Sequence, residues 1–221
     1  MTTSDSGPPR FPKGEAPKGI AGAIDGDLEP CWLCGRSVAA RAMFCHSCGA
    51  VQAPRALDHF TRLGLERRFD IEPEALARQH AGFSRAMDPE RFAARGARQQ
   101  ANARAQADAL GEAYETLHDP VRRARYLLDL LDAPAAVLSA EEDEEVTALV
   151  DRLDGVPDAA AVDRLAQDIG QRVESCIKYL AIAFRNGQTD NAARILARLE
   201  RLEALAAESR TRRSGLAPKS P

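Results

Sequence analysis

Aromatic side chains are scarce in this chain: Phe, Tyr and Trp make up 5% of its 221 residues, and there is a single tryptophan. The hydrophobic fraction of 44% is nevertheless ordinary for a globular protein, so any core must be built mainly from Ala, Leu, Val and Ile. Lysine is also rare, with four among the 30 basic residues. This preference for Arg over Lys, together with abundant Ala, is better explained by the base composition of the genome than by a chemical role.

Three further absences argue against particular classes of protein. No apolar run approaches the roughly 18 residues that a membrane-spanning helix needs. The first residues lack the apolar segment and the cleavage pattern of a secretory signal. The net charge is −3, whereas a nucleic-acid binder usually carries an excess of positive charge. We therefore expect a cytoplasmic protein with no membrane and no nucleic-acid partner.

The chain divides by composition into a tail, a cysteine-rich segment and a helical region. Residues 1–28 are rich in Pro, Gly and small polar residues, which predicts a disordered tail. Residues 29–53 hold four of the five cysteines and are too short to bury a core unaided. In residues 56–132, apolar residues recur at spacings of three and four. Prolines, glycines and capping residues divide this region into four helices, expected over 57–65, 73–87, 97–117 and 120–131.

Residues 138–208 have the pattern of an antiparallel three-helix bundle. Ser139 and Glu142 form a capping-box sequence at the start of the first helix. Two longer segments then repeat apolar residues at helical spacing. Residues 209–221 are expected to be a disordered tail. Since strand patterns are lacking outside the cysteine region, the sequence predicts the all-α class.

The cysteine cluster has the spacing of a metal site. Cys31 and Cys34 are followed, after ten residues, by Cys45 and Cys48, and Gly35 and Gly49 follow the two pairs. Two residues between thiolates let both sulfurs reach one ion, and four thiolates close a tetrahedral site. This pattern favours a zinc knuckle with structural zinc over its rivals, which are iron in the same geometry and a redox-active dithiol. We expect His46 to lie on the surface and Trp32 to pack over the knuckle.

The stretch AMDPERFAARG, residues 86–96, places an acid-flanked proline between two predicted helices. If these helices form an antiparallel hairpin, the turn lies at one exposed end. Arginines 78, 85, 91, 95, 98 and 104 make this end locally basic. From the residues alone, two interpretations stay open: a solvated capping turn and a binding site.

At this point the sequence resembles a family, the HscB type of J-domain co-chaperone in iron–sulfur cluster assembly. The resemblance is carried by the cysteine knuckles and by QAPRALDHFTRLGLERRFDIEPEAL, RFAAR and ALGEAYETLHDPVRRARYLLDLL. It implies a J-domain helical hairpin followed by a C-terminal bundle. It also implies that the protein binds a DnaK-class ATPase chaperone and an iron–sulfur scaffold protein, with no enzymatic activity of its own.

The family's chaperone-binding loop carries His-Pro-Asp, and this sequence departs from it. Alignment through RFAAR places Asp88, Pro89 and Glu90 at these positions, so only the proline matches. The resemblance implies chaperone binding by these three residues together with Arg78, Arg85 and Arg91. An ionised Asp accepts hydrogen bonds but donates none, unlike His. Loss of such a contact costs roughly 2–5 kcal/mol at an interface.

For scaffold binding, the family's motif on the first bundle helix best matches LVDRLD. The resemblance carries scaffold contact onto Leu149, Val150, Leu153 and Asp154. The alternative is that Leu149 and Leu153 pack inside the bundle.

Three hypotheses of function follow. The first is a co-chaperone that promotes ATP hydrolysis by a DnaK-class chaperone and delivers the scaffold. The second is a J-like adaptor that has lost this stimulation because of its altered loop. The third is a zinc-ribbon nucleic-acid binder, which the acidic net charge disfavours.

Overall fold

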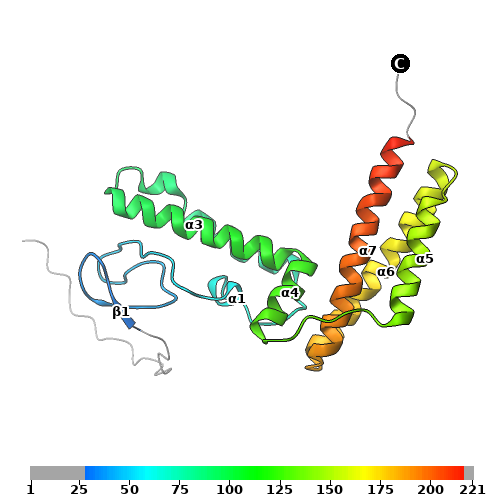
Figure 1. The fold of residues 1–221 in the computed structure, drawn as a ribbon. Coiled ribbons are helices and arrows are strands. Elements are labelled where there is room, and N and C mark those ends of the chain that lie inside the picture. Colours follow the sequence, from blue (N-terminus) through cyan, green and yellow to red (C-terminus); the bar gives the residue numbers. More distant parts are fainter. Residues whose placement is uncertain (1–27, 217–221) are drawn as a thin grey trace, which may run out of the picture.

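The computed structural model describes residues 28–216, which are mainly helical (Figure 1). The elements are β1 (Leu28–Pro30), β2 (Ser37–Ala39), α1 (His59–Arg62), α2 (Pro73–Ala86), the 3₁₀ helix η1 (Pro89–Phe92), α3 (Ala97–His118), α4 (Pro120–Leu130), α5 (Ala140–Asp154), α6 (Ala159–Arg185) and α7 (Thr189–Gly215). The predicted all-α class is confirmed, because the described residues contain only one small two-stranded sheet. Within residues 28–216, no helix combines the length and apolarity needed to cross a bilayer.

Helices α2 and α3 form the predicted hairpin, and α1 and α4 both pack against α3. The helix ends follow local chemistry. Pro73 begins α2, and the Asp119 carboxylate accepts the Arg122 amide at 2.8 Å where α4 begins. The core between these helices is aliphatic, and the fully buried side chains include Leu76, Leu110 and Leu117.

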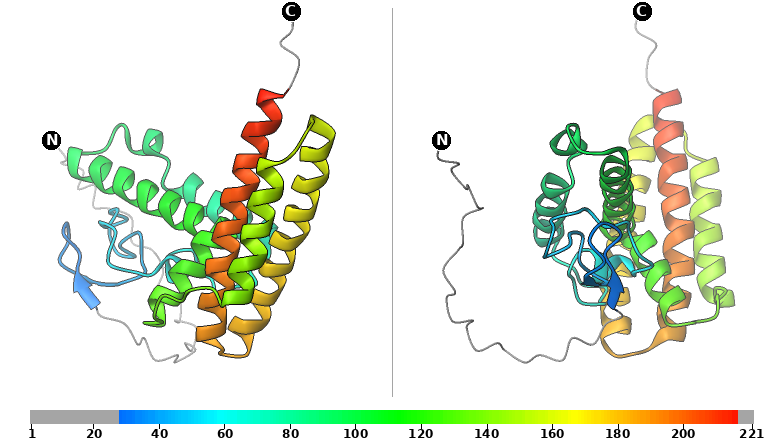
Figure 2. Two further views of the ribbon diagram at one scale, coloured as in Figure 1. Left: turned by 45° about the vertical axis from the view of Figure 1, so that its right-hand side comes forward. Right: turned by 90° about the vertical axis from the view of Figure 1, so that its left-hand side faces the viewer.

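Helices α5, α6 and α7 lie side by side as the predicted bundle (Figures 1 and 2). The capping box at the start of α5 is present: the Ser139 hydroxyl accepts the Glu142 amide, and the Glu142 carboxylate accepts the Ser139 amide at 3.0 Å. Leu180, Leu199 and Leu202 are fully buried between the helices. The spacing of three and four in the sequence therefore marks the core face correctly.

The bundle is longer than predicted at its C-terminal end. We expected a tail from residue 209, but α7 continues to Gly215. The last turns of α7 are held by polar contacts rather than by apolar packing. Arg212 donates to the Asp154 carboxylate at 3.0 Å, and Arg213 donates to Asp163 at 2.7 Å. The tail predicted for residues 1–28 lies outside the described residues apart from Leu28, and residues 217–221 lie outside them too.

The hairpin and the bundle share one continuous hydrophobic core. At their junction, the rings of Phe69 and Phe184 stack with centroids 5.4 Å apart. The Arg123 guanidinium also lies over the Phe69 ring, 4.9 Å from its centroid. Arg185 pairs with Asp70 at 3.3 Å across the same junction. These contacts hold the two helical parts in a fixed relation.

Asp58 provides a test of local stabilisation. Its carboxylate caps α1 by accepting the Thr61 amide at 3.0 Å and pairs with Arg67 at 2.7 Å. Burial alone would raise the pKa of this carboxyl, but Arg67 and Thr61 lower it to about 2. Because this value is below that of the unfolded chain, the ionised form stabilises the fold above about pH 4, and the contribution is lost as pH falls toward 2.

We expect Asp58→Ala to lower the free energy of unfolding by about 1–2 kcal/mol at pH 7, a figure reduced by solvent screening at the exposed Arg67. Urea denaturation at several pH values measures this cost. The difference from the native protein should shrink between pH 4 and pH 2. A difference that grows as pH falls would contradict the proposed role of the charge.

Candidate functional site

The cysteine module is built from two tight turns of the same design. Strands β1 and β2 pair antiparallel, with Pro30 opposite Ser37, and lead into the first turn. The Gly35 amide donates to the Cys31 carbonyl at 2.9 Å, and the Gly49 amide donates to the Cys45 carbonyl at 2.9 Å. Both glycines have positive φ, of 73° and 71°, which residues with a side chain rarely adopt. The glycine after each cysteine pair therefore permits the backbone angles that the turn requires.

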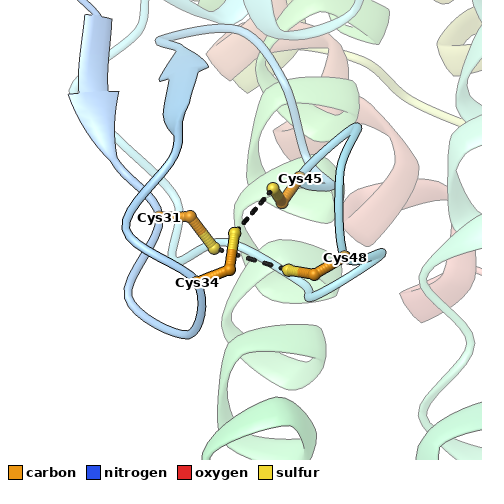
Figure 3. Close-up of side chains that lie close together, drawn as sticks. All are labelled: Cys31, Cys34, Cys45 and Cys48. Atoms are coloured by element: carbon orange, nitrogen blue, oxygen red, sulfur yellow. Dashed lines mark hydrogen bonds between the residues drawn. The ribbon is translucent and has the colours of Figure 1, made fainter.

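The four sulfurs of the module converge on one point (Figure 3). The Sγ atoms of Cys31, Cys34, Cys45 and Cys48 all lie within 4.8 Å of one another. The separations Cys31–Cys48 and Cys34–Cys45 are both 3.7 Å. A tetrahedral ion with metal–sulfur bonds of about 2.3 Å requires sulfurs roughly 3.8 Å apart. The cluster therefore fits one metal ion, and all four cysteines are free thiols.

Hydrogen-bond donors surround the sulfurs and favour their ionised form. The Leu33 amide and the Gln52 side-chain amide each donate to Cys31 Sγ at 3.4 Å. Burial opposes ionisation of Cys31, but the backbone amides of Cys34 and Leu33, with Gln52, lower the pKa of its thiol to about 6. The Ala50 amide favours ionisation of Cys48, yet burial and the three neighbouring thiols raise its pKa to about 12. Without a cation the four thiols cannot all ionise together, which is the electrostatic condition that a divalent ion relieves.

The module docks on α3 through its backbone (Figure 2). The Val51 carbonyl accepts the Trp32 indole N–H at 2.7 Å and the Asn102 side-chain amide at 2.8 Å. The Gln106 side-chain amide donates to the Gln52 carbonyl at 3.0 Å, and this contact is buried. The Arg98 guanidinium lies 4.5 Å from the centroid of the Trp32 ring. Trp32 therefore packs on the knuckle as expected, and His46 is exposed as expected.

Sequence reasoning missed the α3 side of this interface. Gln99, Asn102 and Gln106 lie on one face of α3 at spacings of three and four. The Gln99 side-chain carbonyl accepts the Val51 amide at 3.3 Å, so all three of these side chains bond to the backbone of the module. A row of amide side chains at helical spacing was the available signal. The spacing of these amides does not reveal their binding partner, which is a backbone segment about fifty residues earlier in the chain.

The predicted chaperone-binding loop is the exposed end of the α2–α3 hairpin. The Asp88 carboxylate accepts the Glu90 amide at 3.0 Å, so Asp88 caps η1. Glu90 is exposed. Arg91 donates to the Arg85 carbonyl at 2.9 Å, which places both arginines beside the loop. Arg78 does not join them: it lies about two turns before Arg85 in α2 and pairs with Glu72 and Glu74 at 3.4 and 3.6 Å.

The predicted scaffold-binding residues fall into two groups. Leu149 and Leu153 are 2% and 1% exposed, so they lie inside the bundle, and only Val150 is half-exposed. Asp154 pairs with Arg212. Scaffold contact at this position of α5 stays a prediction for Val150 and Asp154, with the two leucines supporting them from beneath.

This difference in burial gives a prediction. Leu149→Ala should lower the free energy of unfolding by about 2–4 kcal/mol, because it leaves a cavity in the bundle. Val150→Ala should cost less than about 1 kcal/mol, since its side chain is only half-buried and Ala favours helix. Chemical denaturation of both variants is the measurement. Equal costs would contradict the assignment of the two side chains to core and surface.

The chain is similar to curated co-chaperones and to a solved structure. It is 32% identical over 158 residues to a co-chaperone protein HscB homolog of Paraburkholderia phymatum, an alignment that covers 68% of this chain and 90% of that protein. It is 31% identical over 123 residues to the co-chaperone protein HscB of Proteus mirabilis, covering 53% and 71%. The crystal structure of human co-chaperone protein HscB superposes with a TM-score of 0.79 at 20% identity, covering 85% of this chain and all of that one, which supports the fold. No protein-family model matches the chain.

Proposed function

Since the chain belongs to the HscB family of J-domain co-chaperones of iron–sulfur cluster assembly, we propose that it recruits a DnaK-class ATPase chaperone. In this proposal the loop between α2 and α3 binds the chaperone and promotes its ATP hydrolysis, while the C-terminal bundle delivers an iron–sulfur scaffold protein. The protein acts through its partners' chemistry and performs no reaction itself.

The observation that carries this proposal is the exposed turn at the end of the α2–α3 hairpin. The turn keeps the family's proline at position 89, and the exposed Glu90 follows it. Arg85 and Arg91, also exposed, lie beside it. Their guanidinium groups suit an acidic surface on the chaperone. Arg78 contributes less in this proposal, because Glu72 and Glu74 neutralise it.

A second candidate function is that of an adaptor without stimulation. It is favoured by the Asp88 carboxylate, which accepts the Glu90 amide of its own turn. The family's His at this position can donate a hydrogen bond to a partner, and an ionised carboxylate cannot. In this second proposal the loop still docks, but the contact that triggers hydrolysis is missing.

Single-turnover ATP hydrolysis by the organism's DnaK-class chaperones distinguishes the two candidates. We expect the native protein to stimulate hydrolysis and Glu90→Ala to reduce stimulation roughly thirtyfold or more, because a lost charged contact costs about 2 kcal/mol or more at an interface. Glu174→Ala, which removes an exposed carboxylate from α6, is the matched control and should leave stimulation unchanged. If the native protein binds but only Asp88→His with Glu90→Asp stimulates, the adaptor function replaces the first proposal.

For the metal, we propose structural zinc held by Cys31, Cys34, Cys45 and Cys48. All four donors are sulfur, and a fourfold sulfur site leaves no open position for a substrate or a water molecule. When bound, zinc cross-links the two turns. Four thiolates would leave a net charge of −2 on the zinc site, and the amide donors of Leu33 and Gln52 at Cys31 stabilise this negative charge.

The metal assignment is tested by elemental analysis of the purified full chain. We expect about one zinc ion per chain and loss of most of it in Cys45→Ser, because three thiolates bind zinc more weakly than four. Cys176→Ser is the control, since Cys176 is buried in the bundle away from the cluster and its removal should leave the zinc content unchanged. Iron in place of zinc, or equal zinc in both variants, would refute the assignment.

A further inference from the structure

The second cysteine turn contacts the loop that follows α2. Phe44, the residue before Cys45, stacks on Phe92, with ring centroids 6.4 Å apart and an angle of 30° between the rings. Phe92 is the last residue of η1 and is 9% exposed. Phe44 is half-buried and forms an isolated bridge with Val51. An aromatic contact therefore joins the metal module to the segment that contains Pro89 and Glu90.

Helix α3 holds the same loop from its other side. The Gln100 side-chain amide donates to the carbonyls of Ala93 and Arg95, at 3.0 and 2.8 Å. These bonds fix the stretch after η1 but do not reach the turn at its start. Within η1, the Arg91 amide donates to the Asp88 carbonyl at 3.1 Å, and the Ala93 amide donates to the Glu90 carbonyl at 3.2 Å. The Arg91 side chain also joins η1 to the Arg85 carbonyl of α2, and Phe92 is the residue through which the cysteine module adds its own support to η1.

The module that carries Phe44 is in turn fixed to both the sulfur cluster and α3. Gln52 joins these two: its side-chain amide donates to Cys31 Sγ, and its carbonyl accepts from Gln106. The Gln52 amide also donates to the Met43 carbonyl at 2.9 Å, one residue before Phe44. A segment of this size cannot fold around its own few apolar residues. Its shape, and with it the position of Phe44, depends on the cross-link at the sulfurs and on the docking to α3.

We propose that the cysteine module is a brace for the chaperone-binding loop and that Phe44 is its positioning residue. Metal at the four sulfurs holds Phe44 against Phe92, and Phe92 holds η1 in the conformation that presents Glu90. The functional part of this inference rests on the proposed binding of a chaperone by the loop. The structural part does not.

Amide hydrogen exchange in the full chain tests the structural part. In Phe44→Ala, the amides of Arg91, Ala93 and Arg95 should exchange roughly threefold to tenfold faster, the change that corresponds to loss of one aromatic pair. Removal of the metal with a chelator should accelerate them at least as much. Leu33→Ala is the matched control, because this exposed leucine lies in the first cysteine turn. Amides of α7 serve as the internal control.

Two further measurements keep this test decisive. Metal content and the fluorescence of Trp32, the single tryptophan, show whether Phe44→Ala leaves the module folded and docked. Should that variant lose metal, Asn102→Ala with Gln106→Ala loosens the docking from the α3 side without altering the module, and it should accelerate the same loop amides. Loop amides that exchange at the native rate in the metal-free protein would overturn the brace.

The chaperone assay tests the functional part. A loop that is less often in its binding conformation raises the co-chaperone concentration needed for half-maximal stimulation, by the same threefold to tenfold, without lowering the maximum. Phe44→Tyr keeps the ring and should restore the native value. Faster loop exchange with unchanged half-maximal concentration would overturn the functional part. If the native protein neither binds nor stimulates a DnaK-class chaperone, the proposed function fails, and the exchange result still decides whether the module braces the loop.

Discussion

A segment as small as the cysteine module cannot bury enough apolar surface to fold alone, and much of the structure follows from that constraint. Its own buried hydrophobic residues are Cys31, Val38, Cys45 and Ala50. The remaining stabilisation has to come from the contacts with α3 and, in the proposed function, from a metal cross-link at the sulfurs. The module, predicted from sequence as a separate unit, is therefore packed against the hairpin, and Val51 belongs to the main core.

Five of the few aromatic residues lie at contacts between separate structural elements. Phe69 and Phe184 stack at the junction of hairpin and bundle, Phe44 and Phe92 stack between module and loop, and Trp32 lies between module and α3. Aliphatic residues make up most of the core between the helices. These five large rings lie where separate elements meet, since one such ring covers area that several alanines could not.

The helices were predictable because their signals are local. Asp119 before Pro120 and Ser139 before Glu142 are caps that the structure places as predicted. The convergence of the four cysteines was predictable for the same reason, since two residues between thiolates suffice to bring them together. Local spacing does not identify the partner in a contact that joins distant segments, such as Asn102 with Val51 or Arg212 with Asp154, and the end of α7 was misplaced as a result. The chaperone and scaffold contacts involve surfaces of other molecules, so the residues proposed for them rest on family resemblance and exposure.

The late end of α7 has a consequence for the order in which the protein forms during synthesis. Arg212 holds the end of α5, and Arg213 holds Asp163 near the start of α6, so the turn between these two helices is secured by residues made long after it. The cysteine module and the hairpin are complete by Leu130, so they can fold while the chain is still on the ribosome. The bundle gains its last contacts only when residue 213 has emerged. The loop between α2 and α3 is thus synthesised in full before the C-terminal bundle can close.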